Sequence, residues 1–318
     1  MRPKLRLVVD KAAHFLRWEL PYFTKHFELV SKAAEDVVLF AYGPDLLESA
    51  AHRPALRRVA MLFPGFGLNP YHNVEYRRQA LEIVESCYDL VFVNPGPLAE
   101  AYKPSSKVIS SPFSVDTESI PCKRFRKSID SLIHVSADYP HKDWQRSAEV
   151  MRLTRLPYEV FPSRNRQPSS ISPLNVVRWR LNRWSKHLGG PQLFRVLPWQ
   201  YVKHTAVVRK YQQYDGFVHI AAEDPTRRNV DGKYTATLLE AGITGAILFW
   251  HDTLGLGNDL ETVFDMPLVP QQAAADIVDI RHYLDVEQHS RLTREEILDR
   301  YDAERSVDFR CSKIKELL

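Results

Sequence analysis

Apolar residues in this chain gather in short runs, and these runs alternate with segments in which apolar positions recur every three or four residues. The short runs predict buried strands and the longer period predicts amphipathic helices. The strands predicted in the first third are residues 5–9, 36–41, 59–63, 89–94 and 107–109. The helices predicted between them are residues 12–27 (disturbed at Pro21), 74–87 and 97–102. Such alternation predicts a parallel, doubly wound sheet with ligands beyond the carboxyl ends of its strands.

The alternation stops at residues 110–128, a polar and basic stretch with two prolines, and then begins again. The later strands are predicted at 131–135, 158–161, 193–197, 217–222 and 246–250, and the later helices at 141–155, 201–213, 234–241 and 292–318. This pattern predicts an α/β fold of two domains joined by a linker. The predicted boundaries are 1–112 for the first domain, 113–128 for the linker, 129–300 for the second domain and 301–318 for a last helix that packs back on the first domain.

Residues 217–251 form the most informative unit, which reads strand, loop, helix, strand. Such βαβ units join into parallel sheets. Asp231-Gly232 predicts a turn before the helix, and Gly242 and Gly245 predict its end. The helix N-terminus carries free amides and a partial positive charge, so it can hold a phosphate.

Several side chains strengthen this predicted phosphate site. Gly232 allows close backbone approach, Lys233 adds positive charge and Thr235 offers a hydroxyl. Glu240, further along the helix, can accept hydrogen bonds from both hydroxyls of a ribose. A solvated loop followed by an ordinary packing helix explains these residues equally well, because one βαβ unit is a weak motif.

Residues 163–190 do not fit the alternation: they hold six Lys or Arg, two Trp and no acidic residue. A helix at 176–187 would place Val177, Leu181 and Trp184 on one face. Two functional interpretations of this basic insert are an interfacial membrane contact and a nucleic-acid contact. The interpretation we favour is a surface helix packed by its Trp residues, with Arg stems over apolar surface.

The composition is that of an ordinary soluble protein with room for two domains, since 44% of the 318 residues are hydrophobic and 26% are charged. No apolar run is long enough to predict a transmembrane helix, and the N-terminus lacks the apolar core of a secretory signal. Three widely spaced cysteines predict a reducing compartment, so we expect a cytoplasmic protein. The net charge of +4 fits an anionic small molecule, an anionic membrane surface or nucleic acid.

Three segments together resemble the GT-B glycosyltransferases, and more narrowly their retaining, nucleotide-sugar-dependent branch, the glycosyltransferase-4-like group. The linker SSPFSVDTESIP resembles the family's segment ending in Val-Asp-Thr-Glu. SLIHVSADYPHKDWQRSAEVM resembles the first strand, Lys-containing loop and helix of the family's second domain. FVHIAAEDP with LLEAGITGAILF resembles its signature strand, acidic loop, Glu-Ala helix and following strand. The match covers residues 105–255 and implies two Rossmann-like domains facing each other across a cleft.

The resemblance also implies roles for individual residues. Lys142 would neutralise the donor diphosphate, and Glu240 would hold the ribose. The donor base would stack near Phe161 and Pro198. The backbone that would meet the phosphates belongs to Gly232, Lys233, Tyr234 and Thr235.

The family has Gly-Arg where this chain has Ser136-Ala137, so one diphosphate cation is missing. We expect Lys233, Arg227 or Arg228 to replace it. A pair of Glu residues eight positions apart is also incomplete, because its first position is Gly232. The residues expected to contact the sugar or the acceptor hydroxyl instead are Glu223, Asp231 and, from the first domain, His72.

The resemblance thus implies a glycosyltransferase that moves a sugar from a nucleoside diphosphate donor, with UDP favoured, to a glycan, lipid or other hydroxyl acceptor. Retention of configuration follows from the resemblance, and no cofactor is expected. No metal is expected either, because the sequence has no Asp-x-Asp and no Cys/His cluster with zinc spacing. The basic insert leaves two alternatives open: peripheral contact with the inner membrane face, or a nucleic-acid-directed protein such as a DNA-base glycosyltransferase. The incomplete Glu pair leaves a third, a non-catalytic GT-B-like partner subunit.

Overall fold

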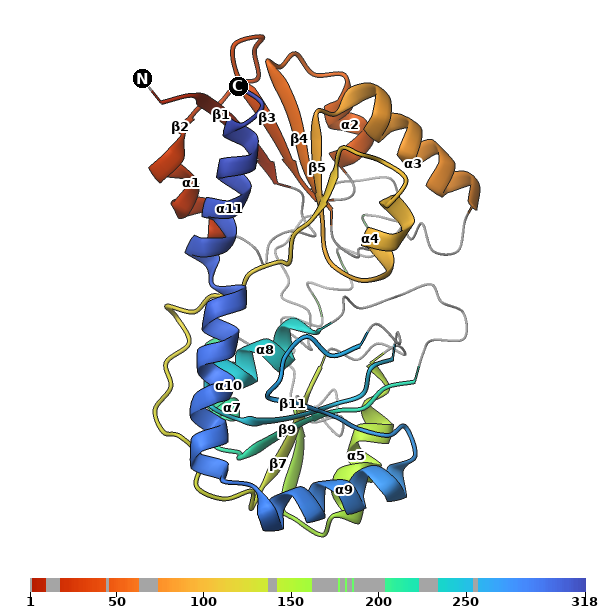
Figure 1. Ribbon diagram of the computed structural model, residues 1–318, viewed down its shortest axis with the longest axis vertical. Helices are drawn as coiled ribbons and strands as arrows, with labels where there is room; N and C mark the ends of the chain where they lie inside the picture. Colours follow the sequence, from red (N-terminus) through yellow and green to blue (C-terminus); the bar gives the residue numbers. More distant parts are fainter. Residues whose placement is uncertain are drawn as a thin grey trace.

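The computed structural model describes most of the chain, as residues 2–9, 18–43, 46–62, 74–136, 142–161, 204–222, 234–253 and 257–318, with 177, 181 and 185. These residues form two separate parallel sheets with helices on both faces, as the alternation predicted (Figure 1). None of the described helices has the length and apolar character that crossing a bilayer requires.

The first sheet has six strands in the order β2-β1-β3-β4-β5-β6, all parallel. Its strands are β1 Lys4–Val9, β2 Glu28–Leu29, β3 Val38–Tyr42, β4 Arg57–Leu62, β5 Leu90–Val93 and β6 Val108–Ser110. Its helices are α1 Leu20–His26, α2 Leu47–Ala51, α3 Val74–Cys87 and α4 Pro97–Tyr102.

The second sheet has five parallel strands in the order β11-β10-β9-β7-β8. Its strands are β7 Leu132–Val135, β8 Tyr158–Phe161, β9 Gly216–His219, β10 Ile247–Trp250 and β11 Val263–Asp265. Its helices are α5 Trp144–Leu153, α7 His204–Tyr211, α8 Ala236–Ile243, α9 Pro270–Tyr283 and α10 Val286–Tyr301, and α11 Ala303–Lys315 follows.

Central strands are apolar at consecutive positions because both faces of each sheet are covered. In β3, Phe40 packs in one cluster while its neighbours Leu39 and Ala41 pack in another, as the two-residue period of a strand requires. In β9, Phe217 and Val218 divide between the two faces in the same way. Each half is therefore a three-layer α/β/α unit.

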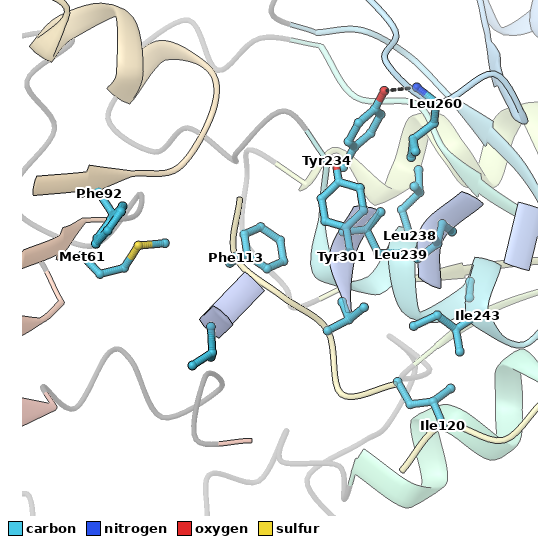
Figure 2. Close-up of a cluster of buried hydrophobic side chains, with 14 of the residues drawn as sticks. Met61, Phe92, Phe113, Ile120, Tyr234, Leu238, Leu239, Ile243, Leu260 and Tyr301 are labelled. Atoms are coloured by element: carbon cyan, nitrogen blue, oxygen red, sulfur yellow. Dashed lines mark hydrogen bonds between the residues drawn. The ribbon is translucent and has the colours of Figure 1, made fainter. Parts of the chain in front are cut away.

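The two halves are joined by two segments that lie side by side. Val115, between β6 and β7, forms a parallel bridge with Asp302, between α10 and α11. The Val115 amide donates to the Tyr301 carbonyl at 3.0 Å, and the Thr117 hydroxyl donates to the Asp302 carboxylate at 2.8 Å. In Figure 2, Phe113 lies between Met61 and Phe92 of the first sheet and Tyr301 of the second half. One continuous apolar cluster thus runs from one half into the other.

The last helix packs against the first half through a fully buried ion pair. Arg310 of α11 donates from two nitrogens to the two carboxylate oxygens of Glu19, each at 2.7 Å. Arg310 also donates to the Tyr42 hydroxyl, and Glu19 accepts from the amide of Ser114 at 3.1 Å. A bidentate pair with further hydrogen bonds offsets the cost of burying two charges.

A second buried arginine, Arg126, lies in the second half and has only neutral partners. Its guanidinium donates to the carbonyls of Tyr211 at 2.7 Å, Tyr214 at 3.1 Å and Thr244. These carbonyls follow or end α7 and α8, where the helix dipole places partial negative charge. Burial lowers the pKa of Arg126 to about 10, so the group stays charged at neutral pH.

Of four local predictions, those for Gly242 and for the start of the last helical region need correction. Pro21 lies in the first turn of α1, where no amide is needed, and the part of the predicted helix before residue 18 lies outside the described residues. Gly242 does not end α8 but lies inside it, and a Cβ there would come within 2.2 Å of Ile297 on α10. Gly245, with φ +82°, is the residue that turns the chain. The last helical region begins before 292 and breaks at Asp302.

Candidate functional site

The carboxyl ends of β7, β9 and β10 lie at one edge of the second sheet, and hydrogen bonds tie the segments after them together. The Asp143 carboxylate, after β7, accepts from the amide of Ala222, after β9, at 3.2 Å. The Thr253 hydroxyl, after β10, donates to the carbonyl of Ala221 at 2.8 Å. This edge is therefore a connected scaffold, in the place where doubly wound sheets bind ligands.

Lys142 belongs to this scaffold and is partly buried. Its neighbour Asp143 has φ 37°, a left-handed conformation that Asp tolerates better than most residues, and it also accepts from Arg146 at 2.7 Å. Because Asp143 is bonded to Ala222, Lys142 is held beside the carboxyl end of β9. The structure thus places Lys142 at the edge where the resemblance put a cation.

The N-terminus of α8 lies on the segment that follows β9. Thr235 caps this helix, since its hydroxyl oxygen accepts from the Leu238 amide at 3.2 Å. The same hydroxyl oxygen lies 3.1 Å from the hydroxyl of Thr237, in the first turn of the helix. Thr235 therefore organises the helix N-terminus, where free amides and the dipole favour an anion.

Tyr234 is buried and its hydroxyl is engaged away from the helix N-terminus. The hydroxyl oxygen accepts from the amides of Asp259 at 2.8 Å and Leu260 at 3.2 Å (Figure 2), and the hydroxyl donates to Asn258. The ring packs on Trp250 at a centroid distance of 5.0 Å. Burial raises the pKa of Tyr234 to about 12. The side chain is thus an anchor, which leaves the backbone of Tyr234 for the predicted phosphate contact.

Glu240 lies in the middle of α8 and is largely buried. His204 Nε2 lies 2.9 Å from its Oε1, and the Tyr211 hydroxyl lies 3.4 Å from its Oε2, so two residues of α7 hold the carboxylate. Hydrogen bonding to Glu240 raises the pKa of His204, and burial raises that of Tyr211 well above its usual value. Sequence reasoning found Glu240 but not His204, because the two are far apart in the chain.

Two buried histidines stack at the same sheet edge. The rings of His134 on β7 and His219 on β9 are parallel within 9° at 5.3 Å. His134 Nδ1 donates to the Val218 carbonyl at 2.8 Å, which leaves Nε2 to accept from the Ser136 hydroxyl at 2.8 Å. His219 carried no sequence signal, because it lies at the end of an ordinary strand, and Ser136 stood out only as a departure from the family's Gly-Arg.

Other predicted positions are only partly described. Phe161, expected near the donor base, is buried with the Lys210 ammonium 5.5 Å from its ring centroid. Val177 and Leu181 of the basic insert are helical and exposed. The predicted site residues that lie outside the described part of the chain are His72, Pro198, Glu223, Arg227, Arg228, Asp231, Gly232 and Lys233. Within the described residues, no group of three or more His, Cys, Asp or Glu side chains is arranged to hold a metal ion.

No protein-family model and no curated protein matches the sequence. Among solved structures, HepE of Anabaena in complex with UDP-glucose superposes with a TM-score of 0.58 at 13% identity over 99% of both chains. AviGT4, a glycosyltransferase of avilamycin A biosynthesis, superposes with a TM-score of 0.53 at 10% identity over 99% of this chain and 97% of its own.

A variant of S. aureus TarM in complex with fondaparinux, alpha-GlcNAc-glycerol and UDP superposes with a TM-score of 0.58 at 13% identity. The alignment covers 92% of this chain but only 57% of TarM, so this chain spans little more than half of that protein. At these identities the likenesses show a shared fold.

Proposed function

We propose that this chain, whose fold is that of the GT-B glycosyltransferases, transfers a sugar from a nucleoside diphosphate donor to a hydroxyl acceptor. The observation that carries the proposal is the edge of the second sheet, where Lys142 and the N-terminus of α8 belong to segments that follow adjacent strands. A fixed cation and free helix amides are the groups that stabilise a diphosphate leaving group. In this proposal Glu240 holds the ribose.

The proposal assigns the remaining steps to residues outside the described part of the chain. Lys233 and Arg227 supply further positive charge to the diphosphate, with the backbone of Gly232 beside it. Glu223 or Asp231 contacts the sugar, and His72 meets the acceptor hydroxyl. Leaving-group charge is then balanced by side chains and amides without a metal, and we expect retention of configuration.

UDP is the favoured nucleotide, because the HepE complex contains UDP-glucose and the TarM complex contains UDP. The acceptor is proposed as a class only, a glycan, a lipid or another hydroxyl compound. TarM was crystallised with glycan-like ligands, but this chain spans 57% of it, so the likeness does not choose among acceptors.

The direct test measures two properties for each member of a panel of UDP, GDP, ADP and CDP sugars. Thermal shift reports binding, and release of the free sugar reports donor hydrolysis. We expect one nucleotide to raise the melting temperature and its sugar to be hydrolysed slowly without acceptor. Binding without hydrolysis or transfer to any acceptor would favour the non-catalytic partner subunit. No binding of any member would contradict the proposal.

Val177 and Leu181, exposed by 52% and 38%, favour a second role for the basic insert. They lie one helical turn apart, within a segment of six basic and no acidic residues. We propose that the protein is cytoplasmic and contacts an anionic membrane surface there. Co-sedimentation with anionic but not with neutral vesicles is the expected result. Salt-sensitive binding to nucleic acid, with no vesicle binding, would favour the nucleic-acid alternative instead.

A further inference from the structure

The Glu240 carboxylate has one described partner on each oxygen, and both partners come from α7. His204 approaches Oε1 at 2.9 Å and Tyr211 approaches Oε2 at 3.4 Å. These two residues begin and end α7, two turns apart, so they reach the carboxylate from one face of that helix. A carboxylate oxygen accepts about two hydrogen bonds. The α7 contacts therefore leave about one acceptor position on each oxygen.

His204 differs from its partners in its exposure and charge. Its side chain is 44% exposed, whereas that of Glu240 is 9% exposed. The charged groups that act on His204 are Glu240 of α8 and Asp116 of the segment between the sheets. Tyr211, on the same helix as His204, contacts the other carboxylate oxygen of Glu240. Both carboxylates raise the pKa of His204, mainly through the hydrogen bond to Glu240.

We propose that His204 is a positioning residue that holds Glu240 so that each carboxylate oxygen presents one acceptor position to a ribose diol. The inference rests on the proposed function, because it requires a nucleotide donor at this edge. An unheld carboxylate would rotate and lose rotamer freedom on binding, whereas a held one is already oriented. His204 touches neither the nucleotide nor the sugar, so its effect passes through Glu240.

The arrangement makes ribose recognition depend on pH. The pKa of His204 is raised in the folded protein, so below the ordinary value of about 6.5 its charged contact with Glu240 is fully present. That charged contact is lost as the pH rises through the raised pKa. Selectivity for the ribose diol should therefore be highest in mildly acidic solution and decline above neutrality.

The experiment compares the binding of UDP and 2′-deoxy-UDP by calorimetry, because the second lacks one of the two hydroxyls. The proteins are the parent chain, His204→Ala, His204→Gln and the control Arg281→Gln. The control breaks a half-exposed ion pair between Arg281 on α9 and Asp130, which precedes β7. We expect the parent and the control to prefer UDP by about tenfold or more, as for a hydrogen bond to a charged group. In His204→Ala the preference should fall to about two- to threefold.

His204→Gln tests the charge separately from the hydrogen bond. It keeps a donor, so it should retain part of the preference, and that preference should no longer change between pH 6 and pH 8. If His204→Ala binds both nucleotides with the parent's ratio, or if the parent's ratio is independent of pH, the positioning role is wrong while the proposed function stands. If the parent binds neither nucleotide, the proposed function and this inference both fail.

Discussion

The carboxyl edges of the two sheets carry polar groups with different tasks. On the first sheet, the described polar side chain after β5 is Asn94, and its amide oxygen accepts from the Phe113 amide at 3.2 Å. The nearby buried Glu19 carboxylate accepts from the Ser114 amide and from Arg310. On the second sheet, the edge carries Lys142 and a capped helix N-terminus, together with a row of hydrogen bonds between its loops.

The comparison separates polar groups that join the two halves of the protein from polar groups that can bind a ligand. Near the first edge, Asn94, Glu19 and Ser114 fasten the linker and the last helix, so their loss should unfold or loosen the protein. The second edge is fastened by side chain–backbone hydrogen bonds, in which Asp143 accepts from the Ala222 amide and Thr253 donates to the Ala221 carbonyl. Lys142 and the first amides of α8 belong to the segments that these bonds hold. An anion site requires such prearranged donors.

The largest expected effect comes from the joining region. Arg310→Met leaves the Glu19 carboxylate buried without its cation, which should lower the free energy of unfolding by about 3–5 kcal/mol. Chemical denaturation measures this. The double variant Glu19→Gln with Arg310→Met should recover much of the loss, since no charge then remains buried. A loss below about 1 kcal/mol in the single variant would show that this pair does not fasten the last helix.

Lys142→Ala should weaken nucleotide binding and leave the stability of the protein almost unchanged. Removing a cation beside a diphosphate should weaken UDP-glucose binding roughly 10–100-fold, from a charged hydrogen bond worth about 1.5–3 kcal/mol. The melting temperature without ligand should stay within about two degrees of the parent's, because no large apolar group is lost. Calorimetry checks the affinity, with Arg281→Gln as the control. Unchanged affinity would place the diphosphate elsewhere.

Thr235→Ala should moderately lower both the stability of the protein and its affinity for UDP. Loss of the cap costs about 1 kcal/mol of stability and leaves the first amides of α8 less well ordered, so UDP affinity should fall a few-fold. Thr235→Ser keeps the capping oxygen and is the matched control. Equal behaviour of the two variants would mean that the cap does not organise this helix end.

The smallest effect concerns His289 of α10. Its ring stacks on Phe264 of β11, and its Nε2 lies 2.9 Å from the carbonyl of Thr262, which precedes that strand. Burial lowers its pKa, so the folded state holds it neutral while the unfolded chain protonates near its ordinary value of about 6.5. Stability should therefore decline as the pH falls below about 6.5, and His289→Gln should flatten that decline. Denaturation midpoints between pH 5 and pH 8 measure it. A parallel decline in both proteins would assign the acid sensitivity to other groups.

Strong local periodicity let the sequence predict much of the fold. The bounds of α3, α4 and β8 are the predicted ones, and the two-sheet α/β architecture is confirmed. Elements with weak local signals were missed: β2 has two residues and β11 has three, and α9 has small Ala273 and Ala274 on its buried face. These form because tertiary packing covers them, which periodicity does not register.

The candidate site was predicted less completely for the same reason. Lys142 and Glu240 follow from a resemblance in local segments, whereas the His204 contact to Glu240 joins helices 36 positions apart. Gly242 was taken as a helix end because glycine is common there, yet close approach of Ile297 is what requires it. Spatial partners of this kind are set by packing between helices and leave no spacing signal in one sequence.

The most direct test of the central claim is a crystal structure of the chain with UDP-glucose, in which the position of the diphosphate is measured. We predict that its oxygens lie within hydrogen-bond distance of the Lys142 ammonium and of the first amides of α8, with the ribose beside Glu240. A diphosphate bound at the first sheet, or one that leaves Lys142 and the N-terminus of α8 without contact, would contradict the account.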